Sequence, residues 1–185
     1  MDLATEQRTI RRRAGLAILL SLGSCTAAVA LLPGLIALPT GTADRIAFAL
    51  QASLPQFLAV LVAFRLVASG RFHSAADIGG AAIAPPSPQL ARRAAFLQNT
   101  LEQAFLGVGA NLVLAAVVGG AWLALSLAAA LLFPAGRLLF YRAYPEGAAA
   151  RAFGMVLTAT PAMICYAVGV VLLIGQLAGA VPRPG

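Results

Sequence analysis

The sequence predicts an all-α integral membrane protein with five transmembrane helices. Of its 185 residues, 61% are hydrophobic and only 10% are charged, whereas a soluble domain is typically about 45–50% apolar and about 25% charged. A disordered chain would instead combine low hydrophobicity with high charge. Because each span takes roughly 20 residues, five spans with their loops occupy the chain, and we expect no second domain of useful size.

Five apolar stretches, each long enough to cross a bilayer as a helix, lie at Ala14–Leu38, Ile46–Ala68, Ala94–Val118, Ala121–Tyr141 and Phe153–Leu177. Pro55 and Pro161 fall within the second and fifth stretches, where we expect kinks that membrane helices tolerate. The longest connection, residues 70–89, is rich in Gly, Pro, Ser and Ala and holds the single histidine, His73. We interpret this histidine as a loop residue rather than a catalyst.

The arginines support this division of the chain. All thirteen basic residues are arginine, and a cytoplasmic N-terminus places eleven of them on the cytoplasmic side, with only Arg45 and Arg183 opposite. Such a bias follows the positive-inside rule and predicts a C-terminus on the far side of the membrane. The net charge of +7 is therefore a topology signal, and we expect no nucleic-acid partner because no stacking aromatic platform accompanies it.

The N-terminal basic flank also fits a second interpretation. Three consecutive arginines, an apolar run and then Cys25 resemble a lipoprotein signal, but the apolar run continues past the cysteine. We therefore favour Cys25 and Cys165 as small side chains packed within the membrane. Their spacing fits no metal-ligand pattern, so no metal site is expected.

Polar residues cluster on the cytoplasmic half of the third span. Arg92 and Asn99 are seven residues apart, and Glu102 follows Asn99 by three, so all three fall on one stripe of a helix. An ionised carboxylate facing lipid is costly. We therefore expect Glu102 to face other helices and to pair with an arginine.

A second polar region joins the fourth and fifth spans. Arg137 and Tyr144 are again seven residues apart, and Arg151 opens the fifth span. The two regions meet at the same membrane boundary, which favours a site for an anionic ligand whose reactive end points into the bundle. Two alternatives remain. In the first, these polar residues only anchor the helices at the membrane interface and hold them together by hydrogen bonds. In the second, the protein is a transporter with Glu102 as an ion site, but the paired broken segments expected of inverted repeats are missing from the sequence.

Together, these polar residues resemble the MAPEG family, the membrane-associated proteins of eicosanoid and glutathione metabolism. The stretch GRLLFYRAYPEGAAARAFGMVLTATP, residues 136–161, is similar to bacterial members. The resemblance covers residues 46–178 and implies a MAPEG-like four-helix bundle there. It leaves residues 1–45 as a basic flank with an extra N-terminal transmembrane helix, and 179–185 as a short tail. We hypothesise that the extra helix sets the orientation of the other four.

The resemblance implies a homotrimer in a bacterial inner membrane, with glutathione as cosubstrate bound between protomers near the cytoplasmic face. The expected activity is of the glutathione transferase or peroxidase type, in which the thiolate attacks a lipophilic small-molecule electrophile or peroxide. The alternative is a non-catalytic MAPEG-like protein whose polar stripe serves trimer assembly or lipid binding. The implied site comprises Arg151 as the catalytic residue facing the sulfur, and Arg92, Asn99, Glu102, Arg137 and Tyr144 as glutathione-binding residues.

Two positions depart from the glutathione-using pattern. Ala95 stands where an arginine is common, four residues before Asn99, and Phe140 stands where a tyrosine is common, four residues before Tyr144. The first change removes a partner for a carboxylate and the second removes a hydroxyl. Because a hydrogen bond to a charged group is worth roughly 1.5–3 kcal/mol, each loss is expected to weaken glutathione binding.

Overall fold

The computed structural model describes residues 2–81 and 83–182, and these form helices and loops without a strand. Five segments of this part of the chain are long and apolar enough to cross a membrane: Leu3–Gly34, Thr42–Phe72, Pro88–Val117, Gly120–Arg142 and Ala148–Leu177. The predicted all-helical class is thus confirmed, and the number of helical segments in this part of the chain that could span a membrane agrees with the five predicted. Arg183 and the last residues of the predicted tail lie outside the described residues.

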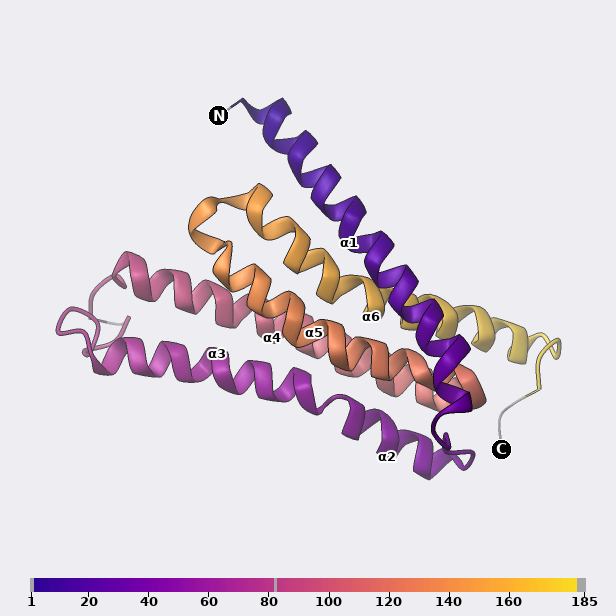
Figure 1. Ribbon diagram of the computed structural model, residues 1–185. Helices are drawn as coiled ribbons and strands as arrows, with labels where there is room; N and C mark the ends of the chain where they lie inside the picture. Colours follow the sequence, from indigo (N-terminus) through magenta and orange to yellow (C-terminus); the bar gives the residue numbers. More distant parts are fainter. Residues whose placement is uncertain (1, 82, 183–185) are drawn as a thin grey trace.

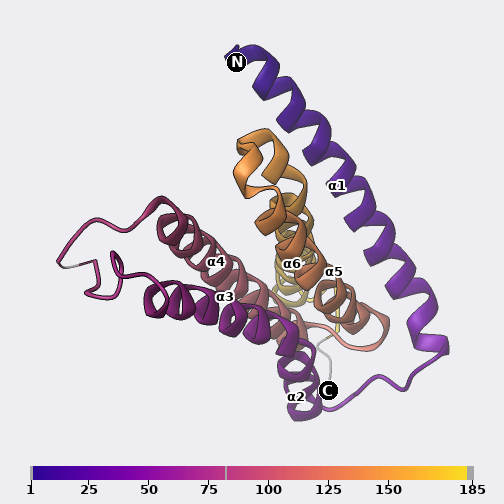
Figure 2. The ribbon, with the colours of Figure 1, turned by 60° about the vertical axis from the view of Figure 1, so that its left-hand side comes forward.

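The helices are α1 (Leu3–Leu31), α2 (Thr42–Ala52), α3 (Leu54–Phe72), α4 (Pro88–Val117), α5 (Ala124–Arg142) and α6 (Ala148–Leu177). Figure 1 shows α3, α4, α5 and α6 packed side by side along one direction as a bundle, with α1 crossing it obliquely. Helix α1 packs against α6 and α5, and Figure 2 shows it on the far side of α5 from α3. The part that resembles a four-helix domain is therefore covered on one side by the additional helix.

The second span is broken where α2 meets α3. Ser53 is the hinge residue, and Pro55 lies in the first turn of α3. Proline lacks the N–H that would continue the hydrogen-bond ladder, so a helix breaks or bends there. The Ser53 hydroxyl donates to the Ala49 carbonyl at 2.7 Å, and the same carbonyl accepts the Ser53 N–H at 3.0 Å, so both groups of Ser53 bond to the last turn of α2. The helix α6 stays continuous through Pro161.

Small residues allow the helices of the bundle to approach closely. Helices α5 and α6 cross at Gly136 and Gly154, where a Cβ on Gly154 would lie 2.6 Å from the Gly136 carbonyl oxygen. On α1, the buried positions Ala17, Ser21 and Cys25 recur every fourth residue and form its inner face. In a membrane, such small residues give backbone-level packing in place of a hydrophobic driving force.

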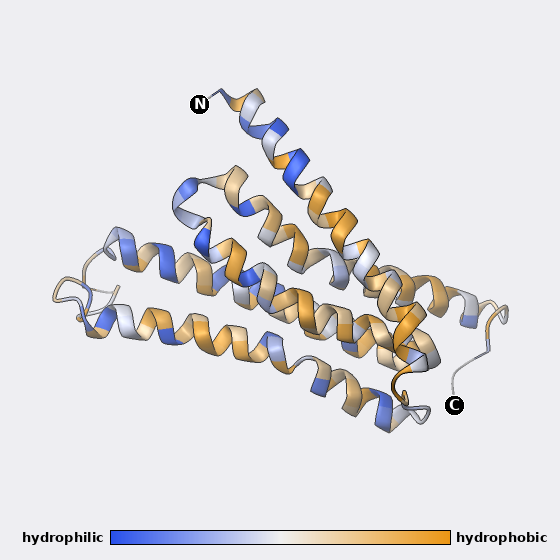
Figure 3. Ribbon diagram, viewed as in Figure 1, coloured by the Kyte–Doolittle hydropathy of each residue, from blue (hydrophilic) through white to orange (hydrophobic). Residues whose placement is uncertain are grey.

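Hydrophilic residues gather at the ends of the bundle, and hydrophobic residues cover its middle (Figure 3). The N-terminus of α1, the α3–α4 loop and the α5–α6 turn lie toward one end, which carries nearly all the arginines (Figure 1). Arg45 lies at the other end, buried, with its guanidinium donating to the carbonyl oxygens of Thr40 and Ala115. We call the arginine-rich end the polar end. Its cytoplasmic location remains a prediction.

The loop between α3 and α4 is held by Asp77. Its carboxylate accepts hydrogen bonds from the Ser87 N–H at 2.7 Å, the Ser87 hydroxyl at 2.6 Å and the Ser74 hydroxyl at 2.7 Å. These bonds, the Ser87 N–H foremost, lower the pKa of Asp77. The Ser87 hydroxyl also accepts the Leu90 N–H as an N-cap. Asp77 thereby fixes the residue at which α4 begins.

Candidate functional site

A pocket of about 380 Å³ opens at the polar end, where α1, α4, α5 and α6 meet. It contains three of the residues singled out from the sequence: Asn99 from α4, Tyr144 from the turn after α5, and Arg151 from the first turns of α6. The structure thus brings together two regions that are more than 40 residues apart in the chain. The remaining lining is apolar: Ile10, Ala95, Phe140, Ala148, Ala152, Met155 and Val156.

Arg151 is held against aromatic rings. Its Cζ lies 4.2 Å from the centroid of the Tyr144 ring and 5.8 Å from that of Phe140, distances at which a cation interacts with the face of a ring. The tight turn that places it runs through Gly147, whose φ of 99° favours glycine. Arg151 makes no hydrogen bond or ion pair with any described residue, so its N–H donors are available to a ligand.

Arg137 lies behind the pocket rather than in its lining. The side chain is 2% exposed, its Nη1 donates to Asn99 Oδ1 at 2.7 Å, and its Nη2 donates to Thr158 Oγ1 at 2.7 Å. Because the amide oxygen of Asn99 accepts from Arg137, the NH2 group of that amide remains for a ligand. Arg137 therefore orients a pocket residue, whereas the sequence prediction had it bind the ligand directly.

The ring of Phe140 lies close to both guanidinium groups. Arg137 Cζ lies 4.6 Å from its centroid, and Arg151 approaches the same ring at 5.8 Å. Phe140 stacks in turn on Phe96 with the centroids 6.2 Å apart. Ala95 and Phe140, the two positions that are expected to weaken glutathione binding, both line the pocket. This part of the pocket wall is thus apolar.

Glu102 lies outside the pocket. It is exposed on α4, and its Oε1 accepts a hydrogen bond from Gln98 Nε2 at 2.8 Å. The prediction that it faces other helices and pairs with an arginine is therefore wrong within a single chain. The physical reason is the rotation of α4: the bond to Arg137 turns Asn99 toward α5. Glu102 is offset around the helix from Asn99, because three residues are less than a full turn of 3.6, and it lies on the exposed side of the stripe.

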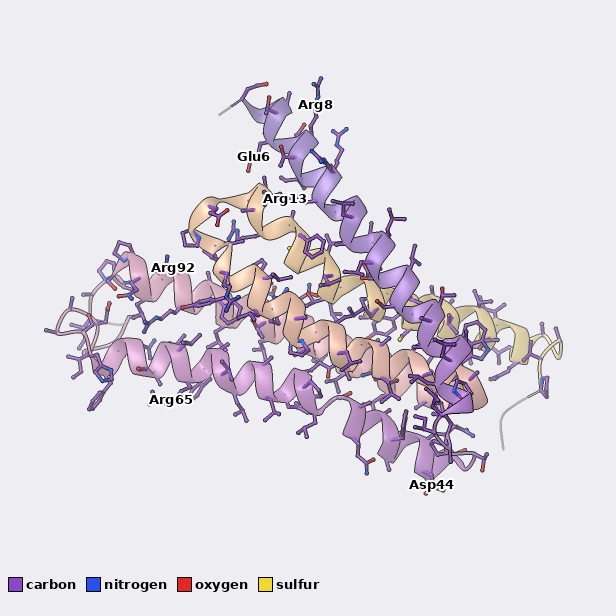
Figure 4. The ribbon with its side chains drawn as sticks, in the orientation of Figure 1. Glu6, Arg8, Arg13, Asp44, Arg65 and Arg92 are labelled. Carbon is purple, nitrogen blue, oxygen red and sulfur yellow. The ribbon has the colours of Figure 1, made fainter. Side chains whose placement is uncertain are left out.

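Arg92 also lies outside the pocket, on the first turns of α4 (Figure 4). It is half-buried and makes no hydrogen bond or ion pair with the described residues. Its neighbour Arg93 donates from Nη1 to the Leu66 carbonyl at 3.1 Å and so ties α4 to α3. Within one chain, the arginine at the start of this helix with a clear packing role is thus Arg93.

Helix α1 contributes residues that the sequence reasoning left out. Ile10 lines the pocket. Glu6 Oε1 accepts the Ala149 N–H at 2.9 Å, and Arg13 Nη1 donates to the Ala149 carbonyl at 3.4 Å. The three residues are four and then three positions apart, which places them on one helical face. The signal available in the sequence was Glu6, a carboxylate within an arginine-rich flank.

An apolar groove of about 310 Å³ lies between α3 and α5 on the other side of Phe96. Leu58 and Val62 of α3 face Leu138 of α5 across it, and Arg137 and Tyr141 belong to the same lining. Arg137 therefore contacts both the groove and, through Asn99, the polar pocket. The buried guanidinium of Arg137 thus lines the apolar groove and is hydrogen-bonded to a residue of the pocket.

Comparison of the chain with protein-family models, with curated proteins and with solved structures finds no match. Among the described residues, no cluster of three or more His, Cys, Asp or Glu side chains is arranged to hold a metal ion. The groups that the pocket offers to a ligand are the guanidinium of Arg151, the oriented amide of Asn99 and the phenol of Tyr144, set in an otherwise apolar lining.

Proposed function

We propose that the protein is a MAPEG-like membrane enzyme that binds glutathione in the pocket at the polar end and transfers its thiolate to a lipophilic electrophile or peroxide. The observation that carries the proposal is Arg151, a cation in the pocket that packs against Tyr144 and has no hydrogen-bond or ion-pair partner among the described residues. The thiolate is the nucleophilic form of a thiol. A guanidinium stays charged at any physiological pH and stabilises that anion.

The other pocket residues fit a peptide-like ligand. Asn99 presents its NH2 group to a carbonyl or carboxylate of glutathione because Arg137 occupies the amide oxygen. Tyr144 packs beside the sulfur-facing arginine and supplies a polar rim. A pocket of about 380 Å³ falls within the range of about 300–1,000 Å³ typical of small-molecule sites.

One protomer does not supply enough polar groups for the whole ligand. Glutathione carries two carboxylates and an ammonium group, while this pocket offers one arginine and, because of Ala95, no second cation. Glu102 and Gln98, exposed on the outer face of α4, are placed to reach a neighbouring protomer. We infer a homotrimer in which Glu102 binds the ammonium group in the pocket of the adjacent chain, with Arg92 beside the same boundary.

The lipophilic cosubstrate approaches from the bilayer. The groove between α3 and α5 is lined by apolar side chains and shares Phe96 and Arg137 with the surroundings of the pocket. With an electrophile, the thiolate forms a sulfur–carbon bond and the leaving group departs with its electron pair. With a peroxide, the thiolate attacks one oxygen, the O–O bond breaks to give a sulfenic acid and an alcohol, and a second glutathione converts the sulfenic acid to a disulfide and water.

Titration of glutathione into the purified protein tests the proposal, with ultraviolet absorbance of the thiolate and calorimetry as readouts. The wild type is expected to bind glutathione and ionise it. Arg151→Ala is expected to lose the thiolate signal, while Arg142→Ala, which removes an exposed arginine at the end of α5, retains it. No binding by the wild type would overturn the proposal.

The same titration separates the alternative function. Glutathione binding without thiolate formation would indicate a ligand-binding protein rather than an enzyme. A non-catalytic assembly protein predicts that Asn99→Ala or Glu102→Gln weakens the oligomer in detergent, while glutathione leaves the melting temperature unchanged. A rise in melting temperature with glutathione counts against that alternative, since a ligand that binds only the folded state stabilises it.

A further inference from the structure

Helix α1 contacts the site through one face. Glu6 and Arg13 lie on the side of α1 that faces the start of α6, and Arg8 points the other way (Figure 4). Ile10, one turn after Glu6 on that same face, lines the pocket itself. Three residues of a helix that the sequence assigned only a topological role thus meet the pocket or the turn that carries Arg151.

The hydrogen bonds of Glu6 and Arg13 both involve a single residue of α6. Ala149 donates its N–H to Glu6 and accepts from Arg13 at its carbonyl. No side chain of α6's own N-terminal flank caps this helix, because the N-cap residue is Gly147. A carboxylate at a helix N-terminus satisfies an orphan N–H and interacts favourably with the helix dipole. Glu6 therefore acts as an N-terminal cap of α6 that is supplied by another helix. The capped residue, Ala149, lies two residues before Arg151.

We propose that α1 is a wall of the functional pocket, in which Ile10 determines the size of ligand accepted and Glu6 and Arg13 are positioning residues for Arg151. This inference rests on the proposed function only for the identity of the ligand. The carboxylate of Glu6 supports it independently: the residue is half-buried, and its Oε2 is buried without a hydrogen-bond partner among the described residues, a state that is costly for a polar atom. We would not expect such a glutamate on a helix whose only role is to set the membrane orientation of the other helices.

Cross-linking tests the placement of α1 without any ligand. Glu6→Cys combined with Ala149→Cys is expected to join through a short bismaleimide in membranes, and Arg8→Cys with Ala149→Cys is the matched control on the opposite face. The native cysteines, Cys25 and Cys165, are buried. Equal cross-linking of both pairs, or of neither, would overturn the inference whether or not the protein binds glutathione.

Ligand size tests the role of Ile10. Ile10→Ala is expected to improve binding of bulky S-alkyl glutathiones relative to glutathione, and Ile10→Trp to weaken both by about tenfold, which corresponds to about 1.4 kcal/mol. Leu19→Ala and Leu19→Trp are the controls, because Leu19 is on the same helix and 67% exposed. An unchanged preference in Ile10→Ala together with unchanged affinities in Ile10→Trp, in a protein that binds glutathione, would overturn the assignment.

The positioning role of Glu6 has its own readout. Glu6→Ala is expected to reduce the fraction of bound glutathione present as thiolate, because the turn that carries Arg151 loses its cap. Glu6→Gln is expected to restore it, since an amide oxygen still accepts the Ala149 N–H. Loss of thiolate in both variants, or in neither, would contradict positioning through this hydrogen bond. Failure of the wild type to bind glutathione would instead remove the proposed function and leave the cross-linking result to decide the place of α1.

Discussion

Arg137 connects three helices through one guanidinium. From α5 it bonds Asn99 on α4 and Thr158 on α6, and its plane lies over the ring of Phe140. A buried charge is costly unless it is paired or hydrogen-bonded, yet among the described residues the guanidinium makes only these two hydrogen bonds, and Nε is buried without a partner there. Of the two residues whose spacing indicated a site, Tyr144 lines the pocket, and Arg137 acts on the pocket through its hydrogen bond to Asn99.

Arg137→Lys is expected to destabilise the protein. A lysine keeps the charge but lacks the planar fork that reaches two acceptors at once, so at least one of the bonds to Asn99 and Thr158 is lost. Each hydrogen bond to a charged group contributes roughly 1.5–3 kcal/mol. Thermal unfolding in detergent measures the effect, and Arg65→Lys on the exposed face of α3 is the control. Equal melting temperatures for the two variants would contradict the role assigned to Arg137.

The α3–α4 loop is expected to depend on pH through Asp77. Its pKa is lowered in the folded protein by hydrogen bonds from Ser87 and Ser74, so the stability it contributes is fully present at neutral pH. That contribution is lost as the pH falls through the depressed folded-state pKa, below the usual aspartate value of about 3.9. Proteolysis or hydrogen exchange of residues 73–87 between neutral and strongly acidic pH measures the transition.

Two variants complete the test of Asp77. Asp77→Asn, which keeps one acceptor oxygen, is expected to loosen the loop already at neutral pH and to remove the acid transition. Asp44→Asn, an exposed residue at the start of α2, is expected to leave both unchanged. An acid transition of the same size in Asp77→Asn would assign it to another group.

At the scale of helices, hydropathy predicted the five spans because length and apolar composition are sufficient for that purpose. The break at Ser53 was indicated by Pro55. The docking of α1 was not predictable, because its inner face consists of small residues, and Ala, Ser and Gly are common throughout this chain. The burial of Gln56 of α3 against Gly107 of α4, with both amide atoms unpartnered among the described residues, likewise depends on a helix rotation that the sequence pattern does not reveal.

Gly154→Ala is expected to force α5 and α6 apart. A Cβ there would lie 2.5 Å from the Phe140 nitrogen and 2.6 Å from the Gly136 carbonyl oxygen, and these backbone atoms cannot rotate away. Overpacking of this kind typically costs about 1–3 kcal/mol. Gly15→Ala on α1 is the matched control because nothing lies within 4 Å of its Cβ position. Thermal unfolding compares the two, and an unchanged melting temperature for Gly154→Ala would contradict the close crossing.

The candidate site was predictable where residues lie on the inner face of one chain. Asn99, Tyr144 and Arg151 share a pocket because the polar stripe and the α5–α6 turn meet at the same end of the bundle. Glu102 and Arg92 were placed in the same set by helical spacing, but spacing does not distinguish a face turned inward from one turned toward another molecule. The outward direction of Glu102 therefore suggests which face of the molecule contacts another protomer.

The outer face of α4 is expected to be a contact between protomers. Glu102 and Gln98 lie near the middle of this 30-residue helix, at a depth where a carboxylate facing lipid is costly, and the adjacent Phe105 is 78% exposed. Native mass spectrometry or light scattering in nanodiscs is expected to show a homotrimer for the wild type. Glu102→Ala is expected to shift it toward monomer, whereas Val171→Ala on the exposed face of α6 leaves the trimer intact. A monomeric wild type would remove the interface, and the pocket would then have to bind its ligand with the groups of one chain alone.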